Sequence, residues 1–129
     1  MRKYIIAFTV SLFLFFGTVN AVTEVPVDVT TMSIDGLLDA MDKGYLTSEN
    51  LVNIYLERID AYDEMFNSIN QINEKAIEQA RELDNEREAG KLRGKLHGIP
   101  ILVKCNIDAY GIPTTAGTKT LSDNYPLQN

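Results

Sequence analysis

The sequence holds very little histidine and cysteine, and this scarcity excludes several kinds of site. His97 and Cys105 are the only residues of their types, so no disulfide can form within the chain. One histidine and one cysteine are also too few for a zinc site built from those ligands. No regularly spaced carboxylate loop points to a different metal, and the chain lacks the glycine-rich phosphate loops of nucleotide-binding proteins. We therefore expect no metal and no bound cofactor.

A Cys–His catalytic dyad is also not expected. The interval between His97 and Cys105 predicts a strand, which at about 3.3 Å per residue would hold them roughly 26 Å apart. A dyad needs hydrogen-bonding reach between its members. We instead expect Cys105 to be a partly buried small residue and His97 to be a hydrogen-bonded residue of a loop or strand edge.

Basic residues are in the minority as well. The chain has 12 Lys and Arg against 18 Asp and Glu, for a net charge of −6. Nucleic acid and anionic lipid both attract cationic surfaces. Neither is an expected partner of this chain.

The N-terminus has the layout of a secretory signal peptide. Arg2 and Lys3 precede an apolar run over residues 4–16, and small residues lead to Ala21. We expect cleavage after Ala21 and a secreted or extracytoplasmic protein. An uncleaved membrane anchor is the alternative, although the run is shorter than the roughly 20 residues of a spanning helix. Residues 22–32 are predicted to be an extended lead-in to a domain over residues 33–129.

Helical patterns dominate the first part of that domain. Ser33 can cap a helix over residues 34–42, and Gly44 can end it. Thr47 or Ser48 can cap a longer helix. Its apolar residues recur at helical spacing and are interpreted as core positions, namely Leu51, Val52, Tyr55, Leu56, Ile59, Tyr62 and Phe66.

A third helix is predicted over residues 74–88, with Asn73 as its cap. Two ion pairs are expected on its exposed side, Glu78–Arg81 and Asp84–Arg87. The basic residues that follow it, Lys91, Arg93 and Lys95, are interpreted as a solvated loop.

An apolar run over residues 99–103 then suits a strand that is buried on both faces. Helices followed by a buried strand indicate an α/β fold, and one or two strands cannot form a sheet by themselves. Lys104 ends this run, where desolvation would favour its neutral amine and so a role as a general base. The alternative is a lysine whose stem packs on apolar surface while its ammonium reaches water.

The sequence "LHGIPILVKCNIDAYGIPTTAG", residues 96–117, resembles the lysine-containing segment of the amidase signature family. That family typically shows G-P-L-H-G-I-P, two hydrophobic residues, V-K-D-N-I and then P-T-T-A-G. The upstream helical sequences, "TSENLVNIYLERIDAYDEMFNSINQI" and "EKAIEQARELD", are also similar to the opening helices of the family. The resemblance runs from about residue 33 to the end.

The resemblance implies an α/β amidase-signature fold, here its N-terminal helices and the first strand or strands of its mixed sheet. It implies hydrolysis or transfer of amides by a nucleophilic serine, a second serine in a cis peptide and a lysine, without metal or organic cofactor. Lys104 matches that catalytic lysine, and a small amide is the implied substrate. Two positions depart from the family pattern: Lys95 stands where proline is usual, and Cys105 where aspartate is usual.

The serines of the family lie in a Ser/Gly-rich segment that these residues do not contain. The serines after the signal region are Ser33, Ser48, Ser68 and Ser122, none in a Gly-Ser-Ser-Gly context. We therefore expect an N-terminal fragment of an amidase domain that carries only the lysine and is inactive alone. A non-catalytic remnant or a small exported binding protein built on the helical opening is the alternative.

Overall fold

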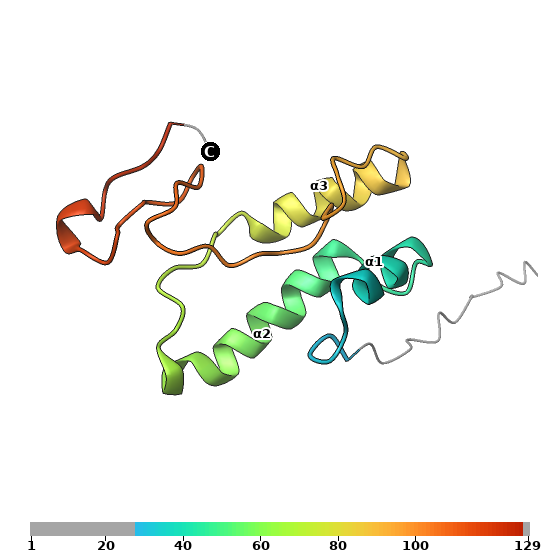
Figure 1. The fold of residues 1–129 in the computed structure, drawn as a ribbon, viewed down its shortest axis with the longest axis horizontal. Coiled ribbons are helices and arrows are strands. Elements are labelled where there is room, and N and C mark those ends of the chain that lie inside the picture. Colours follow the sequence, from blue (N-terminus) through green and yellow to red (C-terminus); the bar gives the residue numbers. More distant parts are fainter. Residues whose placement is uncertain (1–27, 128–129) are drawn as a thin grey trace, which may run out of the picture.

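The computed structural model describes residues 28–127. The predicted signal peptide and most of the predicted lead-in lie outside the described residues. Three α-helices follow one another: α1 (Ile34–Asp42), α2 (Ser48–Phe66) and α3 (Ala76–Glu88). A short 3-10 helix, η1 (Lys119–Leu121), comes near the end. Figure 1 shows α3 alongside α2, with α1 at the N-terminal end of α2 and the last part of the chain extending away from α1.

The first two helices begin where their caps predict. The Ser33 hydroxyl accepts a hydrogen bond from the Gly36 N–H, and the Thr47 hydroxyl accepts one from the Asn50 N–H. Each bond satisfies a backbone donor that the first turn of a helix leaves free. Gly44 follows α1 with a φ of 73°, a left-handed conformation that glycine adopts without strain. The predicted bounds of α1 are thus confirmed.

The third helix starts later than predicted. The helix begins at Ala76 rather than at residue 74, and Lys75 precedes it without a side-chain cap. The Asn73 side chain instead accepts a hydrogen bond from the Lys75 N–H, two residues on. Asparagine readily forms such a local turn with its own backbone, and here the turn takes the place of the helix cap.

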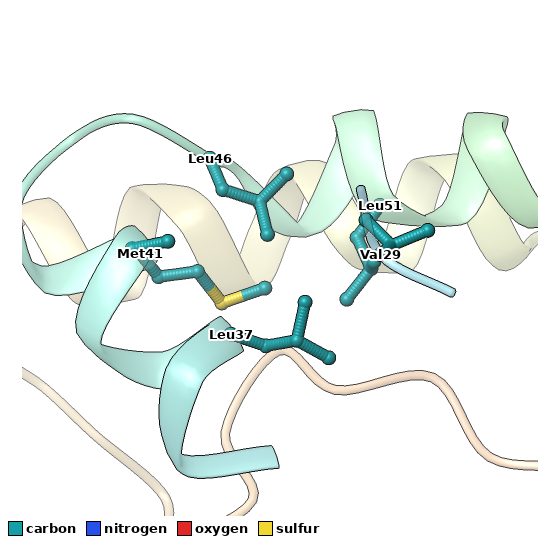
Figure 2. Packing of buried hydrophobic residues seen from close by; sticks show 6 residues of the cluster. Val29, Leu37, Met41, Leu46 and Leu51 are labelled. Atoms are coloured by element: carbon teal, nitrogen blue, oxygen red, sulfur yellow. The ribbon is translucent and has the colours of Figure 1, made fainter. Parts of the chain in front are cut away.

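The hydrophobic core lies between α1 and the N-terminal half of α2. It consists of buried side chains, and Figure 2 shows five of them directed toward one another: Val29, Leu37, Met41, Leu46 and Leu51. Ile54, Tyr55 and Ile99 pack against this cluster. The far half of the predicted α2 stripe does not join it. Tyr62 and Phe66 are 51% and 67% exposed, so the prediction that they pack in the core is wrong for the described residues.

The predicted strand over residues 99–103 is not formed. Within residues 28–127 the only β-type pairing is an isolated bridge between Ala109 and Ile112. Ile101, Leu102 and Val103 are exposed, although the apolar run was expected to be buried on both faces. A strand needs neighbouring strands to satisfy its backbone and cover its faces, and the described part of the chain offers none.

No helix among the described residues is long and apolar enough to cross a membrane.

Candidate active-site segment

The candidate catalytic residue, Lys104, lies on a turn at the surface. Its carbonyl accepts a hydrogen bond from the Ile107 N–H at 2.9 Å, which closes a four-residue turn. The side chain is exposed and, in the described part of the chain, forms no ion pair. The desolvation expected for a lysine at the end of a buried strand is therefore absent here, because the strand itself is absent.

One backbone bond ties the loop after Lys104 back to the turn, because the Ala116 N–H donates to the Cys105 carbonyl at 2.9 Å. The Thr114 N–H donates to the Asn124 carbonyl at 2.8 Å and joins the loop to the segment that follows it. Cys105 is half-buried, which confirms the interpretation of this residue. Residues 105–116 consequently form a closed loop whose two ends meet next to the lysine.

A cluster of polar contacts surrounds His97, which lies eight residues before Cys105. The His97 side chain is 5% exposed, and both of its ring nitrogens are bonded. Nδ1 accepts from the Arg93 N–H at 3.0 Å, and Nε2 lies 2.8 Å from the Leu83 carbonyl oxygen. A carbonyl can only accept, so Nε2 donates to Leu83 while Nδ1 accepts from Arg93. His97 is thus a hydrogen-bonded loop residue, as expected, with no ring nitrogen left for a thiol.

The backbone at His97 and Gly98 is fixed as well. The His97 carbonyl accepts a hydrogen bond from Arg87 at 2.9 Å, and Arg87 also pairs with Asp42 at the end of α1. Gly98 has a φ of 84°, and a Cβ placed on it would lie 2.2 Å from the Ser48 hydroxyl oxygen. Only glycine fits this position, both for its conformation and for its contact with α2.

Asp84 binds the start of α2 from α3. Its two carboxylate oxygens accept hydrogen bonds from the N–H groups of Ser48 and Glu49, at 2.7 and 3.0 Å. These donors belong to the first turn of a helix, where negative charge is favourable. We call the set of Ser48, Asp84, Arg87, His97 and Gly98 the polar junction. The junction joins all three helices to the point from which the chain runs toward Lys104.

The expected ion pairs within α3 are wrong. Arg81 pairs with Glu49 of α2 at 2.7 Å, and Arg87 pairs with Asp42 of α1. Arg93, from the basic loop, pairs with Glu86 through two bonds of 2.7 Å and lowers the pKa of that carboxyl. The loop residues are exposed as predicted. The α3 side chains therefore bond mainly to other elements, which spacing along one helix cannot indicate.

Within residues 28–127, no group of three or more His, Cys, Asp or Glu side chains is placed to hold a metal ion. Asp108, which follows the lysine turn, is exposed. Lys104 remains the candidate catalytic residue of the segment. The polar junction was not predicted from the sequence.

Comparison with known proteins gives a consistent result. The sequence profile of the family described as Amidase matches residues 50–129. A Schizosaccharomyces pombe protein that carries the name amidase is 42% identical over 90 residues, covering 69% of this chain and 15% of that protein. A glutamyl-tRNA(Gln) amidotransferase component from Salinispora tropica is 34% identical over 77% of this chain and 20% of its own length.

Solved structures agree with the sequences. The peptide amidase from Stenotrophomonas maltophilia matches with a TM-score of 0.72 and 38% identity, over 74% of this chain and 20% of that one. An amidase family protein from Bacillus anthracis str. Ames matches with a TM-score of 0.72 and 39% identity, over 78% and 21%. The chain thus shares the fold of part of these α/β proteins and spans about a fifth of their length.

Proposed function

Because the chain belongs to the amidase family, we propose that it carries the lysine-bearing part of a site that hydrolyses amide carbon–nitrogen bonds. Lys104 is the proposed proton acceptor. The observation that carries this proposal is the family match across residues 50–129, which includes Lys104 and the loop that closes beside it. The two serines that the amidase resemblance requires would come from sequence other than these 129 residues.

The proposed mechanism uses a neutral lysine. A nucleophilic serine oxygen attacks the amide carbon while its proton passes through the second serine to the Lys104 amine. The amine product leaves with a proton, and the acyl-serine is then hydrolysed by water, which restores the free serine. Burial of Lys104 in the assembled site would favour the neutral amine that this step needs. A small amide is the proposed substrate.

Export from the cytoplasm is part of the proposal. It is supported by the basic residues Arg2 and Lys3, the apolar run over residues 4–16 and the small residues that lead to Ala21. A secreted product whose first residue is Val22 would agree with it, and N-terminal sequencing of exported protein provides the measurement. Such a location would also make amide transfer on transfer RNA a poor fit, since that reaction belongs in the cytoplasm.

A chimera tests the catalytic proposal. Residues 28–127 would replace the matching N-terminal part of the Stenotrophomonas maltophilia peptide amidase, and ammonia release from a peptide amide would be measured. We expect activity that Lys104→Ala lowers by at least about a thousandfold, the scale of removing one member of a catalytic triad. Lys95→Ala, a matched change of an exposed lysine in the same segment, should alter the rate less than about twofold.

Two results would contradict the proposal. One is a chimera whose activity survives Lys104→Ala. The other is a folded chimera that releases no ammonia, since the lysine-bearing segment of this chain would then not support the reaction. The 129-residue protein on its own is expected to release no ammonia.

A further inference from the structure

Two polar residues are buried among the described residues, and one of them lies in a loop. Ser48 belongs to α2, whereas His97 lies in the loop that follows α3, seven residues before Lys104. A polar side chain is costly to bury unless its hydrogen bonds are made. An apolar side chain could fill the same place without them, so the bonds of the His97 ring are the feature that needs an explanation.

Every hydrogen-bonding group of His97 has a partner. In the ring, Nε2 donates to the Leu83 carbonyl at 2.8 Å, and Nδ1 accepts from the Arg93 N–H at 3.0 Å. In the backbone, the N–H donates to the Gly94 carbonyl at 3.2 Å, and the carbonyl accepts from Arg87 at 2.9 Å. Leu83 and Arg87 belong to α3. His97 is therefore fixed to α3 twice, by its ring and by its carbonyl.

The chain between His97 and Lys104 has little of its own to fix its direction. Ile99 packs against the core, but no backbone–backbone hydrogen bond joins residues 100–103 to another described residue. At about 3.3 Å per residue, this stretch could span roughly 23 Å, so a change of about 10° at one end would move the other by up to about 4 Å. A displacement of about 1 Å can lower a catalysed rate about a hundredfold. Small movements at His97 therefore matter for the place of Lys104.

A second contact between the same loop and α3 is weaker. The Arg93 side chain pairs with Glu86, but the two side chains are 62% and 30% exposed. An ion pair this exposed contributes little, because water competes for both partners. The bond from the His97 ring to Leu83 is buried, where a lost partner costs more. The ring is thus the stronger of the two side-chain links between the loop and α3.

We propose that His97 is a positioning residue, whose ring bond to the Leu83 carbonyl sets the direction in which the chain runs from α3 to Lys104. This inference rests on the proposed function, because it concerns the placement of the proposed proton acceptor. Both ring nitrogens are occupied by backbone groups, so His97 exchanges no proton in the reaction. Its effect reaches the reaction only through Lys104.

Two amide side chains can separate the two ring bonds of His97. His97→Gln places an amide NH₂ near the position of Nε2, so it keeps a donor for the Leu83 carbonyl and gives up the bond from Arg93. His97→Asn is shorter and places an amide oxygen near the position of Nδ1, so it keeps the bond from Arg93 and gives up the one to Leu83. Comparing the two variants shows which bond positions the chain.

The first measurement is nitrogen-15 relaxation of the full 129-residue chain. We expect the Lys104 amide to be ordered, with an order parameter near 0.85, and to fall below about 0.6 in His97→Asn. His97→Gln should stay within about 0.1 of the original protein. Glu86→Gln weakens the exposed ion pair of the same loop and is the matched control. It should leave Lys104 unchanged, as should Leu51→Ala, which lowers stability without touching the loop.

The second measurement uses the covalent chimera with the Stenotrophomonas maltophilia peptide amidase. His97→Asn should lower kcat for ammonia release at least about tenfold and change KM less than about twofold, because a misplaced proton acceptor slows the chemical step rather than binding. His97→Gln should keep kcat within about threefold of the unsubstituted chimera.

The outcomes separate this inference from the proposed function. A mobile Lys104 amide in the original protein, or one whose order His97→Asn does not change, would overturn the positioning role. Equal disorder in His97→Gln, or in Leu51→Ala, would overturn it too. An active chimera in which His97→Asn leaves kcat unchanged would also contradict it. A folded chimera that releases no ammonia counts against the proposed function, and the relaxation data then decide whether His97 positions the lysine.

Discussion

The helical part of the chain, residues 28–98, and the lysine-bearing part, residues 99–127, differ in the burial of their apolar side chains and in the reach of their hydrogen bonds. In the first part Leu51 is fully buried and the polar junction links three helices. In the second, Leu102 is 78% exposed, and from Pro100 to Leu127 the described backbone hydrogen bonds join residues of that segment to one another. The helical part thus has a packed core around Leu51, although the far half of α2 stays exposed, whereas the lysine segment is positioned but left uncovered.

Two leucine-to-alanine variants test this difference in burial between the two parts. Leu51→Ala leaves a cavity in the core and should lower the free energy of unfolding by about 2–5 kcal/mol. Leu102→Ala removes an exposed side chain and should change it by less than about 0.5 kcal/mol. Denaturant unfolding followed by circular dichroism measures both. Equal losses for the two variants would show that the parts are not different in packing.

A pair of glycine substitutions sharpens the role of the polar junction. Gly98 and Gly111 have nearly the same positive φ, 84° and 83°, but only Gly98 lies against Ser48. Both alanine variants incur the cost of a left-handed conformation, about 1–2 kcal/mol. Gly98→Ala should lose about 1–3 kcal/mol more, because its Cβ would overlap the Ser48 hydroxyl. Thermal unfolding measures the stability of both variants. Equal losses of stability would contradict the close contact between Gly98 and Ser48.

Asp84 provides a test of the bond between α3 and α2. Asp84→Ala leaves two N–H groups at the start of α2 without their acceptor and should cost about 1–3 kcal/mol of stability. Asp60→Ala, at an exposed carboxylate on α2, is the control and should cost less than about 0.5 kcal/mol. Denaturant midpoints compare the two. If Asp84→Ala were as stable as Asp60→Ala, Asp84 would not contribute to the stability of the polar junction.

Acid should weaken the helical part gradually and with smaller effects. Hydrogen bonds from Ser68 and Ile69 lower the pKa of Asp63 below its ordinary value of 3.8, and Arg81 lowers the pKa of Glu49 below 4.5. A carboxyl with a lowered folded-state pKa stabilises the protein above its unfolded value, and that contribution is lost as the pH falls through the folded value. We expect stability to decline below about pH 4.5.

Asp63→Asn should make that decline shallower, because one of the contributing carboxyls is gone. Melting temperatures measured between about pH 6 and pH 3 would show this. A variant with the same acid dependence as the original protein would contradict the contribution of Asp63.

The sequence predicts the starts of α1 and α2 well, because their caps are local. Ser33 and Thr47 cap their helices through neighbours three residues away, so residue type and spacing are enough. The bonds of Asp84 to α2 and of Arg87 to α1 reach partners that are 35 to 46 residues away in the chain, and no helical spacing contains that information. The failed pairing within α3 follows from this limit.

The apolar run before Lys104 shows a different limit. Its pattern describes a buried strand, but burial depends on neighbours that the described residues do not include. The pattern therefore indicates the surroundings that these side chains suit, and the structure shows the surroundings that are present. Lys104 itself is identified through the amidase resemblance of its motif, since its position on an exposed turn carries no chemical signature.

Amide hydrogen exchange of the 129-residue protein, followed residue by residue by NMR, tests the central claim most directly. The claim is that a packed helical core holds an uncovered apolar segment, residues 101–103, next to Lys104. It predicts slow exchange for the Leu51 and His97 amides and exchange close to the unprotected rate for Ile101, Leu102 and Val103. Protection at residues 101–103 as strong as that of α2 would contradict the claim, because the segment would then already have its partners.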